Sequence, residues 1–177
     1  MMNPTNVNTT PNAGAPGGGV GAGSLGEGSE GDHLAGATIL VVDDNEQNLE
    51  LLVAYLEDSG ATLVTARDGL EALASVAATR PDLILLDVMM PRMSGFQVCA
   101  KLKQDAGTKD IPIVVVTALN EVADVERAVE LGADDFLTKP VNRLELRTRV
   151  RSLVKLGQLQ KRMNETMDAL KRGQRNA

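Results

Sequence analysis

Apolar and polar positions follow a regular order along the chain from Thr38 onward. Apolar segments of helical spacing, such as Leu49, Leu52, Val53 and Leu56, alternate with short apolar runs that are typical of buried strands. In the second helical segment, Leu70, Leu73 and Val76 are predicted to share one face. The pattern predicts strands over 38–42, 61–66, 83–87, 111–118 and 135–140, with helices within 46–60, 69–81, 95–105, 121–132 and from 142 onward.

A strand is therefore followed by a helix five times. Strands that are apolar on both faces and alternate with helices favour an α/β fold, with a parallel sheet covered by helices on both sides. Ligands of such sheets bind at the carboxyl ends of the strands, near the point where strand order reverses. The sequence thus predicts where the functional residues lie.

The first 36 residues have a different composition. Ten are glycine and three are proline, and apolar residues are sparse, so residues 1–36 are predicted to be a disordered arm. These glycines neither follow a predicted strand nor open a helix, which argues against a phosphate-binding loop. The single histidine, His33, lies in this arm, where a catalytic or metal-binding role is not favoured.

Composition excludes several classes of protein. Hydrophobic residues make up 43% of the 177 residues, but aromatic residues only 2%, so the chain has few rings on which nucleic-acid bases could stack. The single cysteine, Cys99, excludes an intramolecular disulfide and a cysteine-based metal cluster, and we interpret it as a small buried side chain. One thiol, no apolar leader and no membrane-length apolar run together indicate a cytoplasmic protein.

Charge is unevenly distributed. The formal net charge is −6, yet residues 143–177 hold ten basic and only three acidic residues. The same segment carries a heptad-like stripe, which predicts one long helix to about Leu170. A seam for self-association or partner binding and a plain solvated helix both remain open, whereas nucleic-acid binding is disfavoured. Leu146, Val150 and Leu153 are predicted to share a face within the domain, and the stripe continues as Leu156, Leu159, Met163, Met167 and Leu170.

Polar groups follow four of the five predicted strands. Asp43 and Asp44 come after the first, Asp87 ends the third, Thr117 ends the fourth, and Lys139 ends the fifth. Clustered carboxylates repel one another, which favours a hard divalent cation with oxygen ligands, and Mg²⁺ fits best. The cation, the ammonium group and the hydroxyl group would together form a pocket for a phosphoryl group, and a carboxylate oxygen could attack the phosphorus.

Four motifs in this order resemble the receiver domain of two-component response regulators: "VVDDN", "LILLDVMMPRMSG", "VVVTA" and "DDFLTKP". The resemblance covers about Thr38 to Leu156. It implies a flavodoxin-like doubly wound sheet of strand order 2-1-3-4-5. The expected organisation is an arm over 1–36, a receiver domain over 37–156, and a helical extension over 157–177, which is a candidate coiled coil with a frayed end.

The resemblance also implies roles for individual residues. Asp87 would accept a phosphoryl group from a histidine kinase or a histidine phosphotransfer protein, and Thr117 and Lys139 would contact that group. The aromatic switch position is held by Phe136, and the bond before Pro140 is expected to be cis. Mg²⁺ would be held by Asp43, Asp44, Asp87 and the backbone carbonyl of Met89.

Two positions that tune the lifetime of the phosphoryl group in such domains are Met89 and Leu119 here. Both are apolar and neither can orient an attacking water, so slow self-dephosphorylation is expected. The chain is expected to signal through altered protein–protein contacts, without an output domain of its own and without being an enzyme beyond its own phosphorylation and dephosphorylation. A Mg²⁺-dependent phosphohydrolase and a pure scaffold with an idle pocket are the alternatives.

Overall fold

The computed structural model describes residues 34–118 and 122–175. Five strands form one parallel sheet in the order β2-β1-β3-β4-β5, which confirms the flavodoxin-like fold class. The strands are β1 (Thr38–Val42), β2 (Thr62–Ala66), β3 (Leu83–Asp87), β4 (Ile113–Thr117) and β5 (Asp135–Thr138). The helices are α1 (Glu46–Leu56), α2 (Gly69–Thr79), α3 (Gly95–Gln104), α4 (Val122–Glu130) and α5 (Arg143–Arg175), with a short 3₁₀ turn over Glu57–Ser59.

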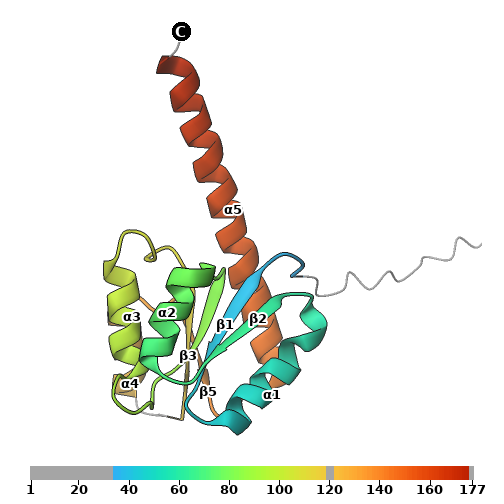
Figure 1. Ribbon diagram of the computed structural model, residues 1–177, viewed down its shortest axis with the longest axis vertical. Coiled ribbons are helices and arrows are strands. Elements are labelled where there is room, and N and C mark those ends of the chain that lie inside the picture. Colours follow the sequence, from blue (N-terminus) through green and yellow to red (C-terminus); the bar gives the residue numbers. More distant parts are fainter. Residues whose placement is uncertain (1–33, 119–121, 176–177) are drawn as a thin grey trace, which may run out of the picture.

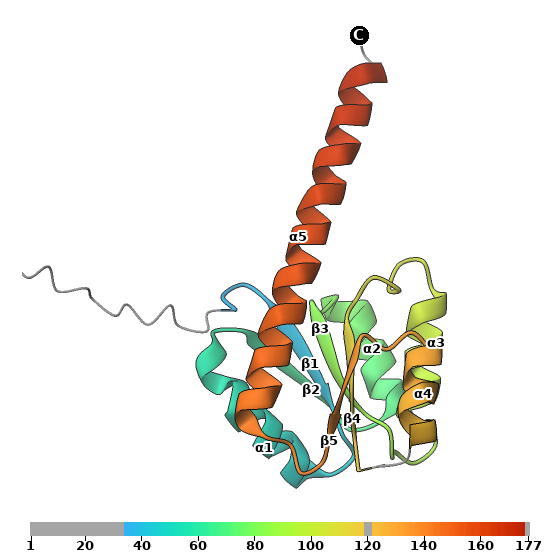
Figure 2. The same cartoon turned by 180° about the vertical axis from the view of Figure 1, so that it is seen from behind.

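Helices cover both faces of the sheet (Figure 1 and Figure 2). Successive residues of a strand point to opposite faces, so β1 sends Leu40 and Val42 to one core cluster and Ile39 and Val41 to the other. The first cluster is closed by α2, α3 and α4, and the second by α1 and α5. Because β1 and β3 are buried on both faces, they form a rigid centre for the sheet.

Two details of packing differ from the expectations. Leu34 is 4% exposed, and its amide donates to the Ser59 carbonyl at 2.6 Å, so the packed chain includes a residue that was assigned to the arm. Leu70 is 57% exposed, because the buried stripe of α2 runs through Ala72 and Val76 and Leu70 lies on a different side of the helix. The other residues of the predicted arm up to residue 33, including His33, lie outside the described residues.

The last helix is longer than its contact with the sheet. Leu146, Val150 and Val154 are fully buried in the second cluster, whereas Leu153 only packs against its margin. Beyond this segment α5 continues away from the sheet as a single projecting helix (Figure 1). Helix α5 therefore consists of a core-packed part and an extension. No helix in the described ranges is long and apolar enough to cross a membrane.

Candidate functional site

The ends of three neighbouring strands bring the predicted acidic residues and Thr117 together. Asp43 follows β1, Asp87 ends the central strand β3, and Thr117 ends β4. Because Val42 pairs with Leu86 across the parallel ladder, the carboxylates after these strands lie side by side. One oxygen of each of Asp43, Asp44 and Asp87 lies within 4.8 Å of the others.

Lys139 joins this group from the end of β5. Its Nζ donates to Asp43 Oδ2 at 2.7 Å and to Asp87 Oδ1 at 2.8 Å. The two aspartates are 1% and 2% exposed, whereas Asp44 is exposed to solvent. One ammonium group cannot neutralise three carboxylates, so the cluster retains negative charge. Its donor set, oxygen atoms without nitrogen or sulfur ligands, fits a hard divalent cation.

Burial and neighbouring charges shift the pKa values of Asp87 and Lys139. Burial raises the pKa of Asp87, and the neighbouring Asp43 and Asp44 raise it further, while Lys139 partly offsets the shift through its hydrogen bond and charge. Burial alone would lower the pKa of Lys139, but its hydrogen bonds to Asp43 and Asp87 outweigh burial and raise it. The lysine is therefore held as an ammonium ion against a carboxylate that is costly to ionise.

Asp43 is positioned by the first turn of α1. Its Oδ1 accepts from the Asn45 backbone amide at 2.9 Å and from Asn48 Nδ2 at 3.1 Å. The Asn45 side chain in turn caps α1 by accepting from the amides of Gln47 and Asn48. No sequence motif pointed to Asn48; the available signal was its place on the first helical turn after the acidic pair.

A close backbone approach follows Asp87. A Cβ atom built on Gly95 would lie 2.1 Å from the Asp87 carbonyl oxygen, so no larger residue fits here without moving this loop. The Gly95 amide donates to the Val88 carbonyl at 3.0 Å, and Ser94 caps α3 in a capping box with Gln97. Glycine is therefore needed at the start of α3 because a Cβ atom has no space beside the Asp87 carbonyl.

The loop between β3 and α3 is also tied to α2. Arg92, which has a left-handed backbone with φ of 67°, forms an ion pair with Asp68. Asp68 also caps α2, because its side chain accepts hydrogen bonds from the backbone amides of Leu70 and Glu71. The hydrogen bond from Glu71 contributes most to lowering the pKa of Asp68. The bond from Leu70 and the charge of Arg92 lower it further, and together they outweigh desolvation. The N-terminus of α2 thus anchors the segment that follows Asp87, a contact that the sequence analysis did not predict.

The other predicted site residues lie around this cluster. Thr117 is buried at the end of β4, and its carbonyl accepts from the Lys139 amide at 2.8 Å. Phe136 is partly buried against the cluster of α2, α3 and α4, and the Lys139–Pro140 bond is cis. The Met89 side chain is 61% exposed. Leu119 lies outside the described residues.

A hollow of about 440 Å³ opens beside Lys139. It lies between α1 and the segment after β5, and it contains the single tyrosine of the chain, Tyr55. Its lining residues are Asn48, Leu51, Leu52, Tyr55, Lys139, Pro140 and Val141.

Cys99 takes no part in the cluster. It is fully buried in α3, and its Sγ lies 3.7 Å from the Leu131 carbonyl. Burial raises the pKa of this thiol, which keeps it protonated and unreactive.

Comparison with known proteins agrees with the geometry. Residues 39–151 match the family model described as response regulator receiver domain. Response regulator PleD of Caulobacter vibrioides is 53% identical over 119 residues, which are 67% of this chain and 26% of PleD. The chain spans between a quarter and about half of the length of the most similar curated relatives.

Two solved structures show the same fold. The receiver domain of a signal transduction histidine kinase from Syntrophus aciditrophicus has a TM-score of 0.63 at 39% identity, covering 67% of this chain and 90% of that one. The Mn²⁺-bound form of response regulator Rcp1 has a TM-score of 0.58 at 34% identity, covering 66% and 91%. On its sequence, its strand order and its acidic pocket, the chain belongs to the family of response regulator receiver domains.

Proposed function

We propose that Asp87 accepts a phosphoryl group from a phosphohistidine of a histidine kinase or a histidine phosphotransfer protein. Its carboxylate oxygen bonds to phosphorus while the phosphorus–nitrogen bond breaks, and the imidazole nitrogen keeps the electron pair and takes up a proton. The observation that carries the proposal is the placement of Asp87: a buried carboxylate at the end of the central strand, fixed by Lys139 at 2.8 Å.

Mg²⁺ is the cofactor that the donor set favours. Asp43, Asp44, Asp87 and the Met89 carbonyl would hold it, and when bound it would neutralise charge on the phosphoryl oxygens. Asn48 keeps Asp43 oriented toward this position through its amide at 3.1 Å. The Mn²⁺-bound structure of Rcp1 supports a divalent ion in a related protein.

Lys139 and Thr117 would bind the phosphoryl oxygens once Asp87 is modified. Thr117 would move toward that group and Phe136 would turn inward, which changes the surface formed by β5 and α5. The signal then passes to a downstream protein or to a second copy of the chain, in the cytoplasm, and the protein acts as a phosphoacceptor without turning over a separate substrate. A receiver domain over 37–156 with a helical extension over 157–177 suits this role.

Acetyl phosphate provides the direct test. The wild-type chain incubated with acetyl phosphate and Mg²⁺ should give a phosphorylated species on Phos-tag gels and in intact-mass spectra. This species should be labile to hydroxylamine, as an acyl phosphate is. Asp87→Asn should abolish it, because the amide oxygen is a poor nucleophile.

Matched controls separate the roles of the neighbours. Asp58→Asn removes an exposed carboxylate outside the site and should leave phosphorylation unchanged. Asp44→Asn should slow the reaction and raise the Mg²⁺ concentration that it requires. A labile adduct that persists in Asp87→Asn would overturn the proposal.

A further inference from the structure

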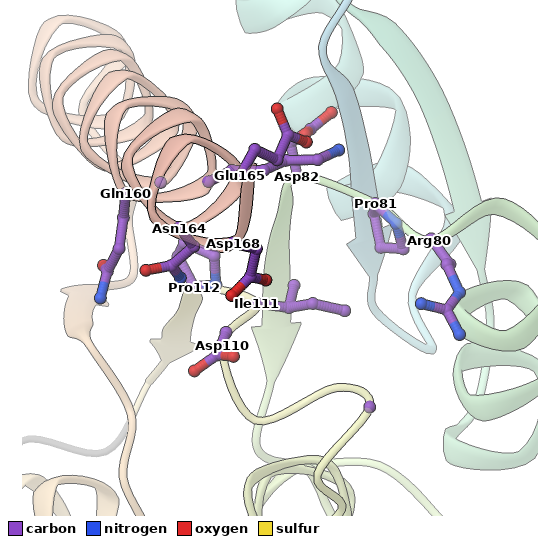
Figure 3. Close-up of a pocket in the computed structure, with 13 residues that line it drawn as sticks. Arg80, Pro81, Asp82, Asp110, Ile111, Pro112, Gln160, Asn164, Glu165 and Asp168 are labelled. Atoms are coloured by element: carbon purple, nitrogen blue, oxygen red, sulfur yellow. The ribbon is translucent and has the colours of Figure 1, made fainter. Parts of the chain in front are cut away.

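The extension of α5 leaves the body of the molecule near Gly157. A Cβ atom on Gly157 would meet the Pro112 ring at 3.6 Å, an ordinary contact distance. Past this point the side of the helix that faces the body does not pack against it. Instead a hollow of about 360 Å³ separates the helix from the loops that precede β3 and β4 (Figure 3).

The helix side of this hollow is polar throughout. Figure 3 shows Gln160, Asn164, Glu165 and Asp168 on the helix, together with Asp82 and Asp110 on the body. The body lines the hollow with the charged residues Arg80, Asp82 and Asp110 and with the apolar residues Pro81, Ile111 and Pro112, whereas the extension faces it with polar side chains. The side chains that line the hollow from the helix are Gln160, Lys161, Asn164, Glu165 and Asp168.

The apolar side chains of the extension lie on a different arc of the helix. At about 100° per residue, the apolar stripe stays within about 40° of Met163, while the polar residues that line the hollow are centred about 130° away from Met163. The body consequently cannot cover the stripe. Its members are between 51% and 62% exposed: Leu156, Leu159, Met163, Met167 and Leu170.

The spacing of the stripe defines its geometry. Leu156 and Met167 are eleven residues apart, and so are Leu159 and Leu170. An eleven-residue repeat follows the helix at about 3.67 residues per turn, which favours a nearly straight or slightly right-handed helix pair over a left-handed supercoil. The stripe therefore remains continuous over about 21 Å of helix, at 1.5 Å per residue.

We propose that the stripe pairs with the same stripe of a second copy of this chain, in parallel orientation. Two identical stripes related by a twofold axis cover each other completely. Five such side chains from each copy amount to on the order of 1,000 Å² of apolar surface, which reaches the lower range of specific interfaces. The area thus suits a reversible dimer.

Charges at the edges of the stripe favour the parallel orientation. Arg162 lies on one edge, and Gln160 and Asn164 lie on the other. In a parallel pair, Arg162 of each copy lies beside the side-chain amides of Gln160 and Asn164 of the other copy. In an antiparallel pair centred on Met163, the two Arg162 side chains meet each other, and like charges at such a contact are unfavourable.

The proposal stands apart from phosphoryl transfer, because the stripe is exposed in the unmodified chain. Sedimentation velocity across micromolar to millimolar concentrations should show a monomer–dimer equilibrium for the wild type. Met163→Glu places a charge at the centre of the stripe and should weaken the dimer at least tenfold. Lys161→Glu, a charge change on the polar side of the same helix, should leave it unchanged.

Disulfide cross-linking tests the orientation. In a Cys99→Ala background, Leu156→Cys and Leu170→Cys should each form homodimers under mild oxidation, because equal positions meet only in a parallel pair. Cross-links only in a mixture of the two variants would contradict the parallel arrangement. A wild-type chain that is monomeric at millimolar concentration, with circular dichroism showing an intact α5, would overturn the proposal and leave the stripe to another protein's helix.

Discussion

Asp87 is buried, lies near two other carboxylates and accepts a hydrogen bond from Lys139. Burial raises its pKa above the ordinary aspartate value, so the folded chain binds a proton at Asp87 more tightly than the unfolded chain does. The stability that depends on this group is therefore greatest at low pH. It falls as pH rises from about the unfolded value through the raised folded pKa.

Replacing this charge should stabilise the metal-free protein. In EDTA at neutral pH, Asp87→Asn is expected to raise the melting temperature by a few degrees, because the amide avoids the cost of a buried charge and still accepts from Lys139 Nζ. The gain should shrink as pH is lowered, because the raised pKa lets the buried Asp87 carboxyl take up a proton at a higher pH than an ordinary aspartate would. Thermal unfolding by circular dichroism across pH measures both effects.

Magnesium should make the wild type more stable than Asp87→Asn, the opposite of the order expected in EDTA. At about one hundred times its dissociation constant, Mg²⁺ should stabilise the wild type by about 2.7 kcal/mol and Asp87→Asn by much less. A melting temperature of Asp87→Asn that is lower than wild type in EDTA would contradict the argument from burial.

At the scale of single elements, the end of α2 is strained. Its C-cap residue is Arg80, with φ of 46° and ψ of 67°, a left-handed conformation that side chains other than glycine adopt at a cost. Arg80→Gly is expected to raise the free energy of unfolding by about 1 kcal/mol. Arg80→Ala should give no such gain, since its Cβ keeps the strain. Urea denaturation of both variants, with equal m-values, measures the difference.

The elements themselves were largely predictable, because their signals are local. The apolar runs predicted all five strands, and the buried β3 run "LILLD" coincides with the observed Leu83–Asp87. Helix faces were less certain: Val154, not Leu153, completes the buried stripe of α5 with Leu146 and Val150. Adjacent apolar residues on a helix give similar periodicity, and only the position of the sheet decides which one is buried.

The site was predictable where a residue ends a strand. Asp43, Asp87 and Lys139 converge because parallel strands share one carboxyl edge. The contacts that hold them were not predictable, because they join distant segments: Arg92 reaches Asp68 across 24 positions of sequence. The approach of Gly95 to the Asp87 carbonyl depends on the path of a loop, and composition alone does not encode that path.

At the scale of the whole molecule, α5 connects the two ends of the sheet. It begins four residues after Lys139, beside the acidic cluster, and its extension leaves past the loops before β3 and β4 at the opposite edge (Figure 2). Arg149 of α5 binds both carboxylate oxygens of Asp135 in β5, at 2.6 and 2.7 Å. A displacement of β5 on phosphorylation would thus reach the helix directly.

The extension should be dispensable for folding. Every described side chain after Gln158 is exposed, so a chain ending at residue 158 is expected to keep its unfolding free energy within about 0.5 kcal/mol. The comparison belongs at concentrations where the full chain is monomeric, since pairing would add stability. A chain ending at residue 145 loses Leu146, Val150 and Val154 from the core and should not fold. Cooperative thermal unfolding of the shorter chain would contradict this division of α5.

The hollow beside Lys139 has a spectroscopic consequence. The chain has one tyrosine and no tryptophan, and that tyrosine, Tyr55, lines the hollow with Lys139 and Pro140. Ultraviolet emission of the unlabelled protein therefore comes from a single ring next to the acidic cluster. The proposed cation binding and acyl phosphate formation at Asp87 would be followed in real time through the intensity of that one fluorophore, without an attached dye and without a substitution near the site.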